Sequence, residues 1–237
     1  MDRTASDETR IPLASAVAGR TSAFLNAVYG WMCIGLVVTA ASAWATASSP
    51  TFVRTILANG PIFWTLAFVQ LAIVVVLSRR VQQLSPTTAG ALFLGYSALT
   101  GLVLSFVLLA YSGESIATTF LVSGGSFAAL AFYGTTTERR LSGMAQFLFM
   151  GLIGVVLASI VGLFWHSDAL QFVLSFAGVI VFAGLTAYDA QRLTAMAREA
   201  PAGDVSSYAI VGALALYLDF VNLFLFLLRF TGRRRDA

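Results

Sequence analysis

The 237-residue chain contains no lysine, one cysteine, one histidine and only 11% charged residues. An ordinary soluble domain has about 25% charged residues, so the composition excludes that class. The single cysteine, Cys33, can form neither an intrachain disulfide nor a thiolate metal site, and we expect it to be a small buried apolar side chain. The net charge of +3 comes from arginines scattered in short segments between apolar runs, which argues against nucleic-acid binding.

What the chain has in abundance is apolar sequence, with 58% hydrophobic residues and a mean hydropathy of +0.85. Its long apolar runs predict an all-α membrane protein with seven transmembrane helices in one domain, residues 23–230. Residues 1–22 are expected to form a polar, mobile cytoplasmic tail, and residues 231–237 a basic C-terminal tail. The expected spans are 23–44, 61–78, 89–111, 116–133, 144–165, a sixth from about 170 that contains Asp189, and 208–230.

The arginines indicate an orientation, because short cytoplasmic loops carry an excess of positive charge. With the amino terminus inside, nine arginines fall on the cytoplasmic side and only Arg54 lies in the outer loops. Arg233, Arg234 and Arg235 disagree, since seven spans place them outside. Either the early charges dominate the orientation, or the last helix enters without fully crossing. A cleaved signal peptide ending near Ala43 is a rival interpretation, but that leader would be unusually long.

Two aspartates, Asp189 and Asp219, interrupt the apolar sequence between residues 178 and 230. An ionisable residue at membrane depth is a candidate functional group. The two acids are 30 residues apart, and the Pro/Gly/Asp-rich break at 201–204 lies midway between them. In a helical hairpin both would lie about 16 Å from the bend, so we expect a carboxylate pair. The residues on the same helix faces are Ser175, Gly178, Phe182 and Thr186 for Asp189, and Tyr208, Gly212, Ala215 and Asn222 for Asp219.

The segments around these acids, AGLTAYDAQ at 183–191 and ALYLDFVNLF at 215–224, resemble the Bax inhibitor family of membrane proteins in its bacterial branch. Similarity extends to LSRR at 77–80 and YSALTG at 96–101. The resemblance implies a seven-helix bundle with the last helix at its centre, acting as a pH-sensitive calcium leak in the bacterial inner membrane. It further implies that the acids at the positions of Asp189 and Asp219 form a hydrogen-bonded, proton-sensing pair.

The resemblance also implies a latch, in which an arginine of the second helix pairs with the aspartate of the sixth. Arg79 and Arg80 are the two candidates, and the motif does not choose between them. Some members of the family carry an acid in the second helix where this chain has Gln70, which puts a third carboxylate in the ion path in doubt.

Two neighbouring carboxylates in a low dielectric cannot both ionise easily, so we expect the pair to titrate as a unit and to serve as the gate. Calcium is expected as the permeant ion, with no permanently bound cofactor and with a weak, transient metal site on Asp189 and Asp219. Supporting polar groups are Asn222, Tyr188 and Thr186. The partners expected are membrane lipid, calcium and protons, and a membrane protease or other membrane protein is a further candidate.

Three other interpretations are open. Asp189 and Asp219 are purely structural in the first. In the second, the chain is an intramembrane aspartyl protease. Those enzymes have Gly-x-Gly before the second aspartate, whereas this chain has Leu216-Tyr217-Leu218 before Asp219, and their Pro-Ala-Leu element is absent from the sequence. We therefore do not expect an enzyme. The third is a non-conducting modulator of a partner such as a quality-control protease or a survival factor.

Overall fold

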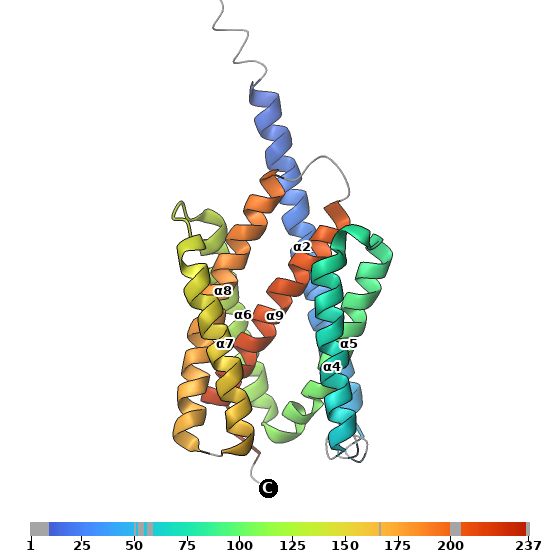
Figure 1. Cartoon of the computed structure of the whole chain (residues 1–237), viewed down its shortest axis with the longest axis vertical. Coiled ribbons are helices and arrows are strands. Elements are labelled where there is room, and N and C mark those ends of the chain that lie inside the picture. Colours follow the sequence, from blue (N-terminus) through green and yellow to red (C-terminus); the bar gives the residue numbers. More distant parts are fainter. Residues whose placement is uncertain are drawn as a thin grey trace, which may run out of the picture.

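A computed structural model of the chain describes residues 10–49, 51, 55, 59–165, 167–199 and 205–235, and nearly all of them are helical (Figure 1). Among these residues, seven helices are long and apolar enough to cross a membrane, which confirms the predicted all-α membrane class. They are α2 (Arg10–Ala47), α4 (Gly60–Arg80), α5 (Pro86–Ala110), α6 (Gly113–Thr136), α7 (Ser142–Phe164), α8 (Asp168–Glu199) and α9 (Val205–Thr231), with a short 3-10 helix, η1 (Val81–Gln83), after α4.

The first helix differs from the expectation, because α2 already begins at Arg10 and residues 10–22 are helical. The polar character of this segment says little about its backbone conformation. Its alanines favour helix, and Pro12 lies in the first turn, where a missing N–H does no harm. Residues 1–9, Arg54, His166 and the predicted bend at 201–204 lie outside the described residues.

Local sequence signals fix several helix starts. Ser85 caps α5 by accepting a hydrogen bond from the backbone N–H of Thr88, and Pro86 follows at the first helical position. Ser112 caps α6 in the same way through the N–H of Ser115. The α5 to α6 turn is therefore short and defined by its caps.

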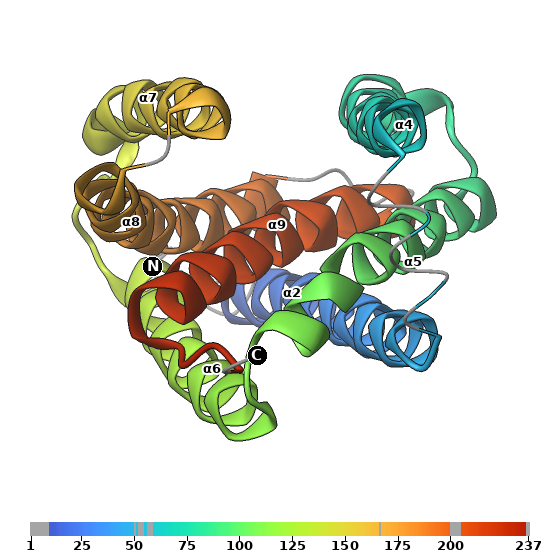
Figure 2. The ribbon, with the colours of Figure 1, turned by 90° about the horizontal axis from the view of Figure 1, so that it is seen from below.

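Helix α9 lies at the centre of the bundle, as predicted. It packs against α2, α5, α6 and α8, and in the view along the bundle the other helices surround it (Figure 2). In the apolar segment of α9, 67% of the residues are buried, compared with 6% in the apolar segment of α4. A helix so enclosed can carry polar side chains away from lipid.

Helix α9 also crosses the whole bundle. Near its start, Ser207 Oγ donates a hydrogen bond to the carbonyl of Leu84, beside the α4 to α5 connection. At its other end the C-terminal tail pairs with the α5 to α6 turn, where the N–H of Arg235 donates to the carbonyl of Ala110 at 2.9 Å. The last helix therefore runs the full length of the bundle and is long and apolar enough to cross a membrane.

A layer of hydroxyl groups joins α9 to α2. Thr39 Oγ1 lies 2.6 Å from the hydroxyl of Tyr217 and also contacts the carbonyls of Gly35 at 2.9 Å and Ser97 at 3.0 Å. Because the threonine hydroxyl has one proton, which a carbonyl accepts, Tyr217 donates to Thr39. Thr39, a buried residue of α2, therefore links α2, α5 and α9 at this level.

Replacing Tyr217 by phenylalanine should therefore lower the free energy of unfolding by about 0.6–1 kcal/mol, the typical value of one such bond within a membrane. Thermal unfolding in detergent measures the change. Tyr208→Phe is the matched control, because Tyr208 lies on the same helix and its hydroxyl makes no hydrogen bond with the described residues. Equal stability of both variants would contradict a structural role for this bond.

Candidate functional site: a carboxylate pair between α8 and α9

Asp189 of α8 and Asp219 of α9 lie together inside the bundle. Their carboxyl groups are within hydrogen-bonding reach of each other. Seven residues before Asp189 and seven after Asp219, the rings of Phe182 and Phe226 stack with centroids 5.7 Å apart. This equal spacing shows that α8 and α9 run antiparallel with the two aspartates at one level, which is the geometry that the midpoint argument predicts.

Close packing of α8 and α9 surrounds the pair. The ring of Phe226 occupies the space beside Gly178 on one side, and the side chain of Leu193 occupies the space beside Gly212 on the other. A side chain at either glycine would collide with these groups, so the small residues on the predicted faces allow the helices to approach. The carboxyls are consequently held between two tightly packed turns.

The two carboxyls differ in their surroundings. Asp219 is 4% exposed, and its Oδ2 is buried without a hydrogen-bond partner among the described residues. Asp189 is half-buried, and Arg192, one turn further along α8, is close enough to interact with it electrostatically. A buried carboxylate oxygen without a partner is costly when it is charged. The arrangement thus suits a pair that holds a proton between two carboxyls.

The two latch candidates lie elsewhere. Arg79 and Arg80 end α4 and are exposed, and in the described part of the chain neither forms an ion pair with Asp189. The arginine near Asp189 is Arg192, which sequence reasoning missed although residues three apart on a helix are neighbours. A latch by Arg79 or Arg80 is not formed in this structure and stays a prediction.

The supporting polar residues bond within their own helices. Asn222 Nδ2 donates to the carbonyl of Leu218 at 2.8 Å, and Thr186 Oγ1 donates to that of Phe182 at 2.8 Å. Tyr188 is half-buried beside Asp189 in the sequence. Gln70 donates to Thr100 Oγ1 at 3.0 Å, so a neutral amide occupies this position of α4.

These residues offer few ligands to a metal ion. Among the described residues no group of three or more histidine, cysteine, aspartate or glutamate side chains could hold one. Calcium takes six to eight oxygen ligands, so two carboxyls alone provide at most a weak, passing contact.

Gln191, two residues after Asp189, anchors this part of α8 to the α6 to α7 connection. Its Oε1 accepts a hydrogen bond from the N–H of Leu141, and its Nε2 donates to the carbonyl of Arg139, both at 2.8 Å. In addition, Gly134 of α6 packs directly on the backbone of Ala187. The helical turn that carries Asp189 is therefore fixed to α6. In the sequence, the only sign of this arrangement is the glutamine within AYDAQ.

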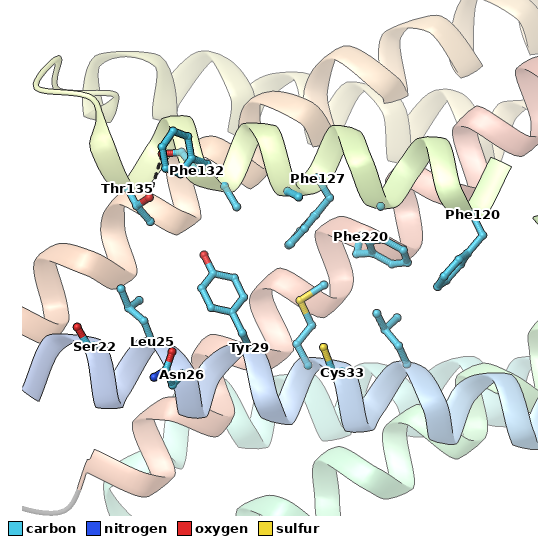
Figure 3. Close-up of a pocket in the computed structure, with 15 residues that line it drawn as sticks. Ser22, Leu25, Asn26, Tyr29, Cys33, Phe120, Phe127, Phe132, Thr135 and Phe220 are labelled. Atoms are coloured by element: carbon cyan, nitrogen blue, oxygen red, sulfur yellow. Dashed lines mark hydrogen bonds between the residues drawn. The ribbon is translucent and has the colours of Figure 1, made fainter. Parts of the chain in front are cut away.

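A cavity of about 600 Å³ opens between α2 and α6 and reaches α9 at Phe220, the neighbour of Asp219 in the sequence. Tyr29, Cys33 and Phe127 are among its lining residues, with Phe220 between the two helices (Figure 3). Cys33 is exposed here, which corrects the expectation of a buried side chain, because it lines the open space between α2 and α6. Neither carboxyl lines this mostly apolar space, so it does not suit an ion path.

Comparison with known proteins assigns the chain to a family. The family model described as inhibitor of apoptosis-promoting Bax1 matches residues 21–236. The chain is 48% identical over 215 residues to inner membrane protein YbhL of Escherichia coli strain K12, which covers 90% of this chain and 92% of the relative. Uncharacterized proteins of Deinococcus radiodurans and Borreliella burgdorferi are 44% and 42% identical, over 90% of this chain and 91% and 93% of their own lengths. The chain is an integral membrane protein, and it belongs to the Bax inhibitor family.

Proposed function

We propose that this protein is a pH-sensitive calcium leak of the bacterial inner membrane, gated by the Asp189 and Asp219 pair. The proposal is carried by Asp219 of the central helix, whose Oδ2 is buried without a hydrogen-bond partner among the described residues, next to the carboxyl of Asp189 on α8. The name of the relative YbhL supports the inner membrane as the location. The arginine distribution supports a cytoplasmic amino terminus.

The proton is the input to the gate. With one proton shared, the carboxyls attract each other and α8 stays packed on α9. When the proton is lost, two negative charges about 4 Å apart repel by about 4 kcal/mol at an effective dielectric constant of about 20. A bias of this size changes the ratio of two conformations about a thousandfold. The charged pair also attracts a cation, so proton loss changes both the packing and the ion affinity of the site.

Weak calcium binding agrees with conduction. An ion that must leave a site quickly cannot be held by a full set of ligands. The two carboxyls supply charge, while Asn222 and Thr186 keep their own hydrogen bonds within α9 and α8. The pair therefore serves as a contact point on a path, and no permanently bound cofactor is needed.

Calcium flux into liposomes tests the proposal. Purified protein is reconstituted, and calcium entry is recorded between pH 5 and 8 for the wild type and for Asp219→Asn. We expect a pH-dependent flux in the wild type and a flux that changes less than about twofold in the variant, because the remaining carboxyl has no second carboxylate to repel it. Asp168→Asn is the matched control, an exposed aspartate in the first turn of α8.

A pH dependence in Asp219→Asn as large as that of the wild type would contradict the gate. Protein that passes no calcium at any pH, yet co-purifies with a membrane partner, would instead support the non-conducting modulator.

A further inference from the structure

A second cavity, of about 390 Å³, lies at the end of the bundle where α9 terminates, away from the carboxylate pair. It is bounded by α5, α7, α8, α9 and the C-terminal tail. In the view from this end, α7 and α4 stand apart on one side with α9 between them (Figure 2). The lining includes the polar residues Gln171, Arg229 and Arg234 and the apolar residues Leu174, Leu225 and Leu228.

The structure holds Arg234 at this cavity through the backbone of the tail. Arg234 forms an isolated antiparallel bridge with Tyr111. The residues on either side of it are also fixed, because the carbonyl of Arg233 accepts a hydrogen bond from the N–H of Ser112 at 3.1 Å, and the N–H of Arg235 donates to Ala110. The N–H of Arg233 further donates to Ser115 Oγ at 2.8 Å. The tail thus has a defined path at the membrane end.

Among the described residues that line this cavity, the charged side chains are all positive. No carboxylate lines it, and among the described residues neither Arg229 nor Arg234 forms an ion pair. The guanidinium carbon of Arg229 lies 5.6 Å from the ring centroid of Phe226, a contact that leaves its N–H donors available. Two guanidinium groups next to an apolar surface are suited to a ligand that has an anionic group at one end and an apolar part at the other.

We propose that this cavity binds the phosphate headgroup of an anionic phospholipid from the leaflet at that end of the protein, with the acyl chains against the apolar surface. Arginine suits a phosphate because its planar N–H donors bond two oxygens at once. A zwitterionic lipid fits less well, since none of the described lining residues is a carboxylate that could receive its ammonium group. Basic pockets between transmembrane helices are a recognised way of holding acidic lipid headgroups.

This site also gives a role to Arg234, one of the three arginines that the orientation argument leaves unexplained. Arg229 and the three tail arginines lie at the end opposite the α4 to α5 connection, where the bias of the remaining arginines predicts few positive charges. A bound phosphate neutralises part of this charge and is itself held there. The proposal does not depend on calcium flux, because it concerns residues outside the Asp189 and Asp219 pair.

Native mass spectrometry of the detergent-solubilised full chain tests the inference. The protein is titrated with phosphatidylglycerol and with phosphatidylcholine of the same acyl chains. We expect phosphatidylglycerol to bind at least about tenfold more tightly, and Arg234→Gln to weaken it about tenfold, since a charge-assisted phosphate contact is worth about that factor. Arg233→Gln is the matched control, because it removes the same charge from the adjacent residue, which does not line the cavity.

Equal binding of the two lipids, or an equal loss in Arg233→Gln and Arg234→Gln, would overturn the proposal. Inorganic phosphate that binds as tightly as phosphatidylglycerol would overturn the lipid assignment and leave a simple anion site. Thermal unfolding without lipid checks that each variant is folded. If Arg234→Gln does not fold, Arg229→Gln replaces it, because that residue lines the same cavity from α9 without taking part in the tail's backbone pairing.

Discussion

Calcium flux through Asp189→Asn should no longer depend on pH between 5 and 8. Asparagine has nearly the same shape as aspartate and keeps a hydrogen bond to Asp219, but it cannot lose a proton. The repulsion of about 4 kcal/mol that two adjacent charges would produce is then absent at every pH. We expect the wild-type flux to change about tenfold or more over this range and the variant flux to change less than about twofold. A calcium-sensitive dye enclosed in proteoliposomes gives the measurement.

Two further variants make this result specific. Asp168→Asn removes an exposed carboxyl from the same helix and should keep the wild-type pH profile. Arg192→Gln removes the charge that interacts with Asp189 and should move the profile without flattening it, because both titrating carboxyls remain. Flux that keeps its full pH dependence in Asp189→Asn would show that the proton acts elsewhere, and the Asp189 and Asp219 gate would have to be abandoned.

The sequence is sufficient to bring the two aspartates together. A single break at 201–204, with Asp189 and Asp219 at equal distances from it, determines their common depth once both segments are helical. Helical periodicity then places Gly178 and Gly212 on the faces that meet. The structure has both features, with Phe226 and Leu193 filling the spaces beside the glycines. Regular helix geometry was enough to predict this contact, because the two helices follow each other in the chain.

Contacts between helices that are distant in the sequence could not be predicted in this way. Lipid is as apolar as the interior of the bundle, so an apolar helix carries little information about which of its faces is covered. The anchoring of Gln191 to Leu141 and the docking of the tail on the α5 to α6 turn depend on such long-range contacts. The exposure of Cys33 is a further case, because nothing in its run of apolar neighbours marks the uncovered face.

Replacing Gly134 by leucine should have the largest effect on stability of any change discussed. A Cβ atom at Gly134 would overlap the backbone of Ala187, mainly its carbonyl oxygen, and a backbone cannot turn aside as a side chain can. Helix α6 must then separate from α8 at the turn that precedes Asp189. Overpacking of this kind costs about 3 kcal/mol. For a chain of this length the melting temperature should fall by about 6–12 °C.

Gly125→Leu is the matched control, since Gly125 lies on the same helix and a Cβ there meets no atom within 4 Å. That variant should melt within about 2 °C of the wild type, because leucine favours helix over glycine and faces open space. The two variants share composition, so a difference between them reports the contact at Ala187 alone. Equal melting temperatures would show that α6 and α8 do not pack closely at this turn, and the Asp189 side of the pair would then lack the support that Gly134 and Gln191 give it.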